Sequence, residues 1–160
     1  REAAESLILQ GADVITMHTD SAATIQAAEA KGVYSVGFNS DMSAYGPKTH
    51  LTSSTQHWES IYRAKIQAVL DGTWKPEAIW HGLKEEVVAL SPINPVVPKE
   101  VVEKMEAYKM EIVAGTRAVY QGPIYDQAGA LKVAEGKTLS DEELHQQNWY
   151  VKGIDGKIPQ

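Results

Sequence analysis

The 160-residue sequence contains no cysteine, which excludes a disulfide framework and a thiolate metal site. No apolar run approaches the roughly 20 residues that a helix needs to cross a bilayer. Lysine and arginine are outnumbered by acidic residues, 15 against 21, and form no long basic run. Because nucleic-acid phosphates require clustered positive charge, a nucleic-acid partner is not expected.

Sequence motifs of catalysis are absent as well. There is no Gly-x-Ser-x-Gly elbow, no Walker loop and no Gly-x-Gly-x-x-Gly turn. The five histidines do not follow a metal-ligand spacing, since His81 and Glu85 would lie roughly 13 Å apart along a strand. We therefore expect no catalytic residue, no metal and no cofactor, and a protein that is not an enzyme.

The sequence also lacks an initiating methionine and a visible signal peptide. It begins at Arg1, inside a predicted helix that spans Glu2–Gln10 and ends before Gly11. We expect a fragment of a longer protein, in which any leader or lipid anchor lies upstream.

Three short apolar runs organise the N-terminal third of the chain: Val14–Met17, Val33–Val36 and Leu51–Ser53. An alanine-rich helix is predicted between the first two, with Asp20 or Ser21 as its N-cap and Gly32 at its end. Short β-branched runs that alternate with helices indicate βαβ units in a parallel sheet. The predicted fold class is therefore α/β.

The remaining elements follow from hydrophobic periodicity and turn residues. Predicted helices span Gln56–Leu70, with apolar residues on one side, and Lys99–Ala114, which Pro98 opens. A capping box, Ser140 with Glu143, predicts a short helix near the end. Predicted strands span Glu77–Leu83 and Glu86–Leu90, and residues 127–137 have a hairpin pattern.

Polar residues follow each of the three apolar runs, and ligands of parallel sheets bind beyond the carboxyl ends of the strands. Each group also has a purely structural interpretation: helix capping for the first, an Asx turn for the second, and core packing of the tryptophan for the third. A lone histidine such as His57 is usually structural. The candidate ligand-binding residues are His18, Thr19, Asp20, Ser21, Asn39, Asp41, Gln56 and Trp58.

Several of these segments resemble the basic membrane lipoprotein family, the purine- and nucleoside-binding proteins of ABC importers. The resemblance covers nearly the whole chain, in short motifs whose order and spacing are specific. It lies in Ala12–Ile15, Gln26–Val33, Val36–Met42, Leu51–Ser53, Gly82–Lys84, Leu139–Leu144 and Trp149–Gly153.

The family resembles type I periplasmic binding proteins, in which two α/β lobes close over a ligand. The resemblance implies that this chain is the C-terminal half only. It is then an incomplete three-layer parallel-sheet lobe, without the N-terminal lobe and without the first strand of its own sheet. Residues 1–120 are expected to form the ligand-binding lobe, and residues 121–160 to cross the hinge and form the tail.

The resemblance also assigns roles to individual residues. Asp41 matches a ligand-contacting carboxylate of the family's Asp-Ser-Asp motif, whose first aspartate is replaced by Asn39. The family's Gly-Gly-Thr-Gly turn is replaced here by residues 18–21, and Gln56 stands where nucleoside binders often carry a lysine associated with the sugar. The loss of that lysine favours a free base such as adenine, or another small planar ligand, over a nucleoside, and Trp58 would stack on its face.

The implied function is that of the solute-binding component of an ABC importer, which binds a purine base or nucleoside. Its expected partners are the small-molecule ligand, the missing N-terminal lobe and the ABC permease. Its expected location is periplasmic, or lipid-anchored at the cell surface. Two alternatives stay open: the effector domain of a transcriptional repressor, marked by an upstream helix-turn-helix, and a doubly wound enzyme domain acting on a nucleoside.

Overall fold

A computed structural model describes residues 1–158, and the chain divides into two compact units, residues 1–107 and 108–160. The division falls inside helix α4 (Lys99–Val113). The expected boundary at residue 120 and the hinge-crossing role of residues 121–160 stay predictions.

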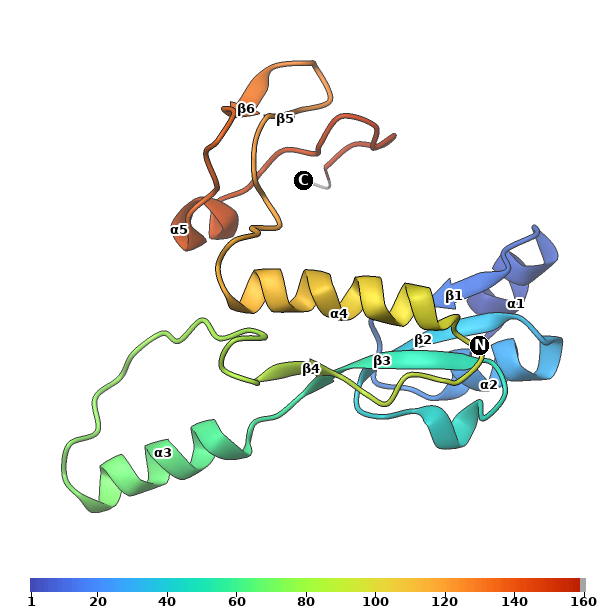
Figure 1. The fold of residues 1–160 in the computed structure, drawn as a ribbon, viewed down its shortest axis with the longest axis horizontal. Helices are drawn as coiled ribbons and strands as arrows, with labels where there is room; N and C mark the ends of the chain where they lie inside the picture. Colours follow the sequence, from blue (N-terminus) through green and yellow to red (C-terminus); the bar gives the residue numbers. More distant parts are fainter. Residues whose placement is uncertain (159–160) are drawn as a thin grey trace. The chain divides into compact units, whose positions relative to one another are not determined.

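A four-stranded sheet with the order β1-β2-β3-β4 forms the centre of the first unit (Figure 1). Strands β1, β2 and β3 are parallel, whereas β4 pairs antiparallel with β3. The parallel α/β fold predicted from the sequence is confirmed. In chain order the elements are α1 (Glu2–Leu9), β1 (Val14–Thr16), α2 (Ala23–Lys31), β2 (Tyr34–Asn39), the 3₁₀ helix η1 (Ser43–Tyr45), β3 (His50–Gln56), α3 (Glu59–Leu70) and β4 (Val88–Leu90).

Helices α1 and α2 pack on one face of this sheet. Ala4 of α1, Ile15 of β1 and Ala27 of α2 form a buried cluster, and Ile25 of α2 is fully buried nearby. Gly32 ends α2 in the left-handed conformation, with φ of 68°, as its position after the alanine-rich run predicts. Alternation along each strand thus determines which residues the two helices cover.

The connection between the parallel strands β2 and β3 is unusually short. Only residues 40–49 cross over the sheet, whereas such connections commonly need a dozen or more. Glu29 of α2 holds the end of this connection: its Oε2 accepts hydrogen bonds from the amides of Lys48 (3.2 Å) and Thr49 (3.0 Å) and from the Thr49 hydroxyl (2.7 Å). The Glu29 carboxylate thus anchors the end of the crossover to α2.

Replacing Glu29 with glutamine is expected to lower the free energy of unfolding by about 1 kcal/mol at pH 7, because hydrogen bonds to a charged acceptor are lost. The Thr49 hydroxyl, helped by the Thr49 and Lys48 amides, lowers the pKa of the Glu29 carboxyl against the opposing effect of burial. The stabilisation is therefore complete above the unfolded pKa and disappears as the pH falls through the folded pKa. Urea denaturation at pH 7 and pH 3 measures this.

The exposed Glu135→Gln serves as the control variant, with an expected change within about 0.5 kcal/mol. An equal loss of stability in Glu29→Gln at both pH values would contradict the charged role of Glu29.

Three predictions about elements of this unit are wrong. Residues 77–83 form no strand in the structure, because they pair with no neighbouring strand and Glu77 instead pairs with Lys65 of α3. Ala22, not Asp20 or Ser21, is the N-cap residue of α2. Helix α3 begins at Glu59 and not at Gln56, because Gln56 belongs to β3 and pairs with β4.

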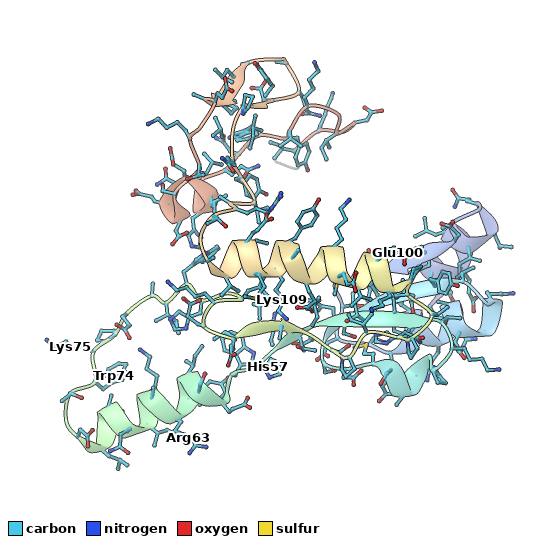
Figure 2. The ribbon with its side chains drawn as sticks, in the orientation of Figure 1. His57, Arg63, Trp74, Lys75, Glu100 and Lys109 are labelled. Carbon is cyan, nitrogen blue, oxygen red and sulfur yellow. The ribbon has the colours of Figure 1, made fainter. Side chains whose placement is uncertain are left out.

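The apolar side of α3 is largely solvent-exposed in the structure. Tyr62, Ile66 and Val69 are each about 61–62% exposed, and Leu70 is 74% exposed. No residue of α3 is fully buried. An open hollow of about 280 Å³ lies between α3 and the segment that follows it, which carries Trp74 and Lys75 (Figure 2). None of the three predicted polar clusters lines this hollow.

The second unit is built on a small hairpin. Strands β5 (Ile124–Tyr125) and β6 (Leu131–Val133) pair antiparallel. The hairpin predicted for residues 127–137 therefore lies further toward the N-terminus, because its first strand is Ile124–Tyr125. Helix α5 (Asp141–His145) starts with the predicted capping box, in which the Ser140 hydroxyl accepts from the Glu143 amide. The peptide bond between Gly122 and Pro123 is cis. Across residues 1–158, no helix combines the length and apolarity that spanning a membrane requires.

Candidate functional site

The candidate site is the edge of the sheet at which the three parallel strands end. The register sets Thr16 of β1 beside Val36 of β2, and Asn39 of β2 beside Thr55 of β3. Residues that follow β1 and β2 come together although they lie 19 positions apart in the sequence, as the hydrogen bond between Asp20 and Asn39 shows. His57, labelled in Figure 2, lies just beyond the end of β3.

An aromatic pair lies at the ends of β1 and β2. The ring centroids of His18 and Phe38 are 4.1 Å apart, with an angle of 34° between the ring planes. His18 is exposed and Phe38 is half-buried, so one surface of the pair remains open to a ligand. Flat aromatic surfaces of this kind stack on planar ligands.

A polar pair lies beside these rings. Asn39 Nδ2 donates to Asp20 Oδ1 at 3.3 Å and so links the turns that follow β1 and β2. Asn39 has a φ of 75°, in the left-handed region that asparagine adopts more readily than other non-glycine residues. The Asp20 carboxylate and Asn39 amide together offer both hydrogen-bond acceptors and donors.

The remaining predicted residues make local contacts at the same edge. Ser21 Oγ accepts from the Ala23 amide at 3.3 Å, and Thr19 Oγ1 contacts Met17 Sδ at 3.9 Å. Asp41 Oδ1 accepts from the Ser43 amide at 2.9 Å, which is the Asx turn considered as the structural alternative. This bond engages one carboxylate oxygen and fixes the direction of the other.

Gln56 and Trp58 differ in their surroundings. Gln56 is the last residue of β3 and pairs with Val88 of β4. Trp58 is 45% exposed and stacks on Tyr62 of α3, with ring centroids 6.3 Å apart. The structure thus joins Asp20 to Asn39 by a hydrogen bond and His18 to Phe38 by a ring contact, whereas Trp58 contacts Tyr62 of its own helix.

Two further residues belong to this edge and were not predicted as ligand-binding. Phe38 carries the ring beneath His18, and Thr55 Oγ1 lies 2.9 Å from His57 Nε2. Phe38 stands directly before Asn39 at the end of β2, but the register that sets it opposite residue 18 comes from strand pairing and is not visible in the sequence. Its apolar character concealed it, because apolar strand residues are ordinarily assigned to the core.

Metal chemistry has no support at this edge. Among residues 1–158, no group of three or more His, Asp or Glu side chains could hold a metal ion. The side chains at this edge present an aromatic surface and hydrogen-bond donors and acceptors, which are the groups that small-molecule sites use.

Comparisons with known proteins identify relatives over the whole chain. Residues 1–122 match the family model for PnrA-like ABC transporter substrate-binding proteins. A purine-binding protein of Brucella abortus is 40% identical over 159 residues, covering 99% of this chain and 45% of its own length. A putative ABC transporter glucose-binding protein of Haloferax volcanii is 32% identical over 160 residues, covering 99% and 38% respectively. The chain therefore spans less than half the length of either relative.

Solved structures share the fold at lower sequence identity. A transcriptional activator of the comK gene from Bacillus halodurans matches with a TM-score of 0.66 and 22% identity over 74% of this chain and 43% of its own. An ABC transporter solute-binding protein from Aeropyrum pernix matches with a TM-score of 0.57 and 18% identity over 78% and 43%. These similarities establish the fold alone.

Proposed function

The chain belongs to the family of PnrA-like ABC transporter substrate-binding proteins, and from that premise we propose that it is part of a solute receptor that binds a purine base. In this proposal the receptor binds its ligand without catalysing a reaction. It acts outside the cytoplasm, where it captures the ligand and delivers it to an ABC permease. The ligand would favour one conformation of the protein through contacts made only in that conformation.

The open aromatic pair of His18 and Phe38 is the observation that carries this proposal. A purine is flat, and it stacks on such a surface while its edge takes hydrogen bonds. The Asp20–Asn39 pair beside the rings supplies an acceptor and a donor for that edge. The 40% identity to a protein named as purine-binding supports the same ligand class.

A sugar is the competing ligand class, because the second relative is named as glucose-binding. Calorimetric titration of the full-length protein with adenine, adenosine and glucose separates the two. We expect binding heat with adenine and none with glucose. Binding of glucose alone would overturn the purine assignment, and hydrolysis of adenosine during the titration would overturn the assignment of a non-enzyme.

Replacing Asp41 with alanine in the full-length protein is expected to weaken adenine binding by about 1–3 kcal/mol, since a hydrogen bond to a charged acceptor is lost. Asp41→Asn keeps the oxygen that accepts from Ser43 while removing the charge, so it separates ligand contact from turn formation. The two variants are expected to lose similar affinity in calorimetry. Full affinity in Asp41→Asn would show that Asp41 acts only through the turn.

Asp71→Ala is the matched control for this test, because Asp71 is an exposed carboxylate at the end of α3 whose Oδ1 accepts from Gln67. Its adenine affinity should equal that of the unchanged protein.

A further inference from the structure

A buried pair of polar side chains lies on the covered face of β3. His50 is 1% exposed and Ser53 is 0% exposed, and His50 Nε2 lies 2.8 Å from Ser53 Oγ. Ser53 Oγ also accepts a hydrogen bond from the Met42 amide at 3.4 Å. Met42 is itself buried and directly follows Asp41. The pair therefore contacts the segment that carries two of the candidate ligand-binding residues.

The need to satisfy the buried Ser53 hydroxyl favours one placement of the protons. The Met42 amide can only donate, so it occupies one lone pair of Ser53 Oγ. His50 Nε2 is the acceptor that the structure places beside this hydroxyl, so the hydroxyl is satisfied when it donates to a neutral imidazole that carries its proton on Nδ1. If Nε2 were also protonated, the Ser53 hydroxyl would lose its acceptor inside a buried site, which costs free energy.

The backbone of β3 is held by other groups. The Ser53 amide donates to Ser91 Oγ at 2.8 Å, the Ser91 amide donates to the Ser53 carbonyl at 2.9 Å, and Asn94 Nδ2 donates to the His50 carbonyl at 2.9 Å. These bonds do not use the side chains of His50 and Ser53. The side chains of His50 and Ser53 instead bond to each other, and the Ser53 side chain also bonds to Met42, which lies outside the strand.

Burial, and not the surrounding charges, favours the neutral form of the imidazole. Burial lowers the pKa of His50, and the negative charge of Asp41 opposes this only in part. Glu29 of α2 faces the same crossover, but its carboxylate is occupied by the Thr49 hydroxyl and the Lys48 and Thr49 amides. Lys48 is the cation of this segment, and it is not among the groups that shift the pKa of His50.

We propose that neutral His50 is a positioning residue for the candidate site: through Ser53 it holds the Met42 amide, and with it the turn from Asn39 to Asp41, in the conformation that binds ligand. Protonation of His50 releases this turn, so ligand affinity falls in acid. The ligand part of this inference rests on the proposed function, whereas the effect on the turn does not.

The test compares two variants of the full-length protein by amide hydrogen exchange without ligand. In His50→Leu the acceptor is lost, and the amides of Met42, Ser43 and Tyr45 are expected to exchange about tenfold faster or more, with core amides such as those of Ile15 and Ala28 unchanged. In His50→Gln a side-chain oxygen replaces Nε2 as the acceptor, so protection should be retained. His81→Leu, at an exposed histidine, is the control.

Acidification gives a second readout. Between pH 7.5 and pH 5, after correction for intrinsic exchange, the turn amides of the unchanged protein should lose protection, whereas those of His50→Gln should not. Adenine affinity measured over the same range should fall only in the unchanged protein. Unaltered turn protection in His50→Leu, faster exchange of all amides together, or equal loss in His50→Gln would each overturn the positioning role.

The two proposals fail in different ways. An absence of adenine binding at any pH would refute the purine assignment, while the exchange of the turn amides would still decide the role of His50.

Discussion

Replacing Ile25 with alanine is expected to lower the free energy of unfolding by about 2–5 kcal/mol, which is a large part of the stability of an ordinary domain. Ile25 is fully buried in α2 and contacts the crossover, because its Cγ2 lies only 2.8 Å from where a Cβ on Gly46 would be. The truncated side chain leaves a cavity that this closely packed region cannot fill. Denaturation by urea, followed by circular dichroism, measures the loss.

Ile66→Ala is the matched control in the same chain. Ile66 is 62% exposed on α3, so removing the same atoms there loses little buried apolar surface. Alanine also has a higher helix propensity than isoleucine. We expect a change within about 0.5 kcal/mol. A comparable loss in both variants would mean that the apolar side of α3 is buried as well, which would contradict its exposure in the structure.

Replacing Gly37 with alanine is expected to cost about 2–4 kcal/mol in stability, through overpacking and through separation of a buried hydrogen-bonded pair. A Cβ at this position would overlap Ser53 Oγ and would lie 3.1 Å from His50 Nε2. Both strands are paired in the sheet and cannot move apart freely. Thermal and urea denaturation report the change.

Gly82→Ala provides the control, because no atom lies within 4 Å of a Cβ built at Gly82. Adding Ser53→Ala to Gly37→Ala removes the overlapping hydroxyl, so the double variant should be less destabilised than the sum of the two single changes. Additive losses would show that the Ser53 hydroxyl is not the atom that glycine accommodates.

Local patterns in the sequence predicted those parts of the fold that depend on neighbouring residues. The alanine-rich run closed by Gly32 predicted α2 and its left-handed end, and Ser140 with Glu143 predicted the cap of α5. Alternating β-branched runs predicted the three parallel strands and so placed His18, Asp20 and Asn39 at one edge. Periodicity and capping are local interactions, and they are therefore legible in a single sequence.

The failed predictions concern residues whose state depends on distant partners. Residues 77–83 have the composition of a strand but find no neighbour to pair with, since an isolated extended segment leaves its backbone groups unpaired. Gln56 was assigned to the start of a helix, yet pairing with Val88, 32 positions away, keeps it in β3. Propensity is weak where such pairing decides the outcome.

The sequence alone determined that this protein has a parallel α/β sheet, which residues follow its strands, and its likeness to a family of solute receptors, because each of these is written in short contiguous motifs. Only the tertiary structure decided that His18 stacks on Phe38, that Asn39 bonds to Asp20, and that His50 and Ser53 are buried beneath the turn from Asn39 to Asp41. Strand register and side-chain burial set these contacts, and both are fixed only when segments far apart in the chain pack together.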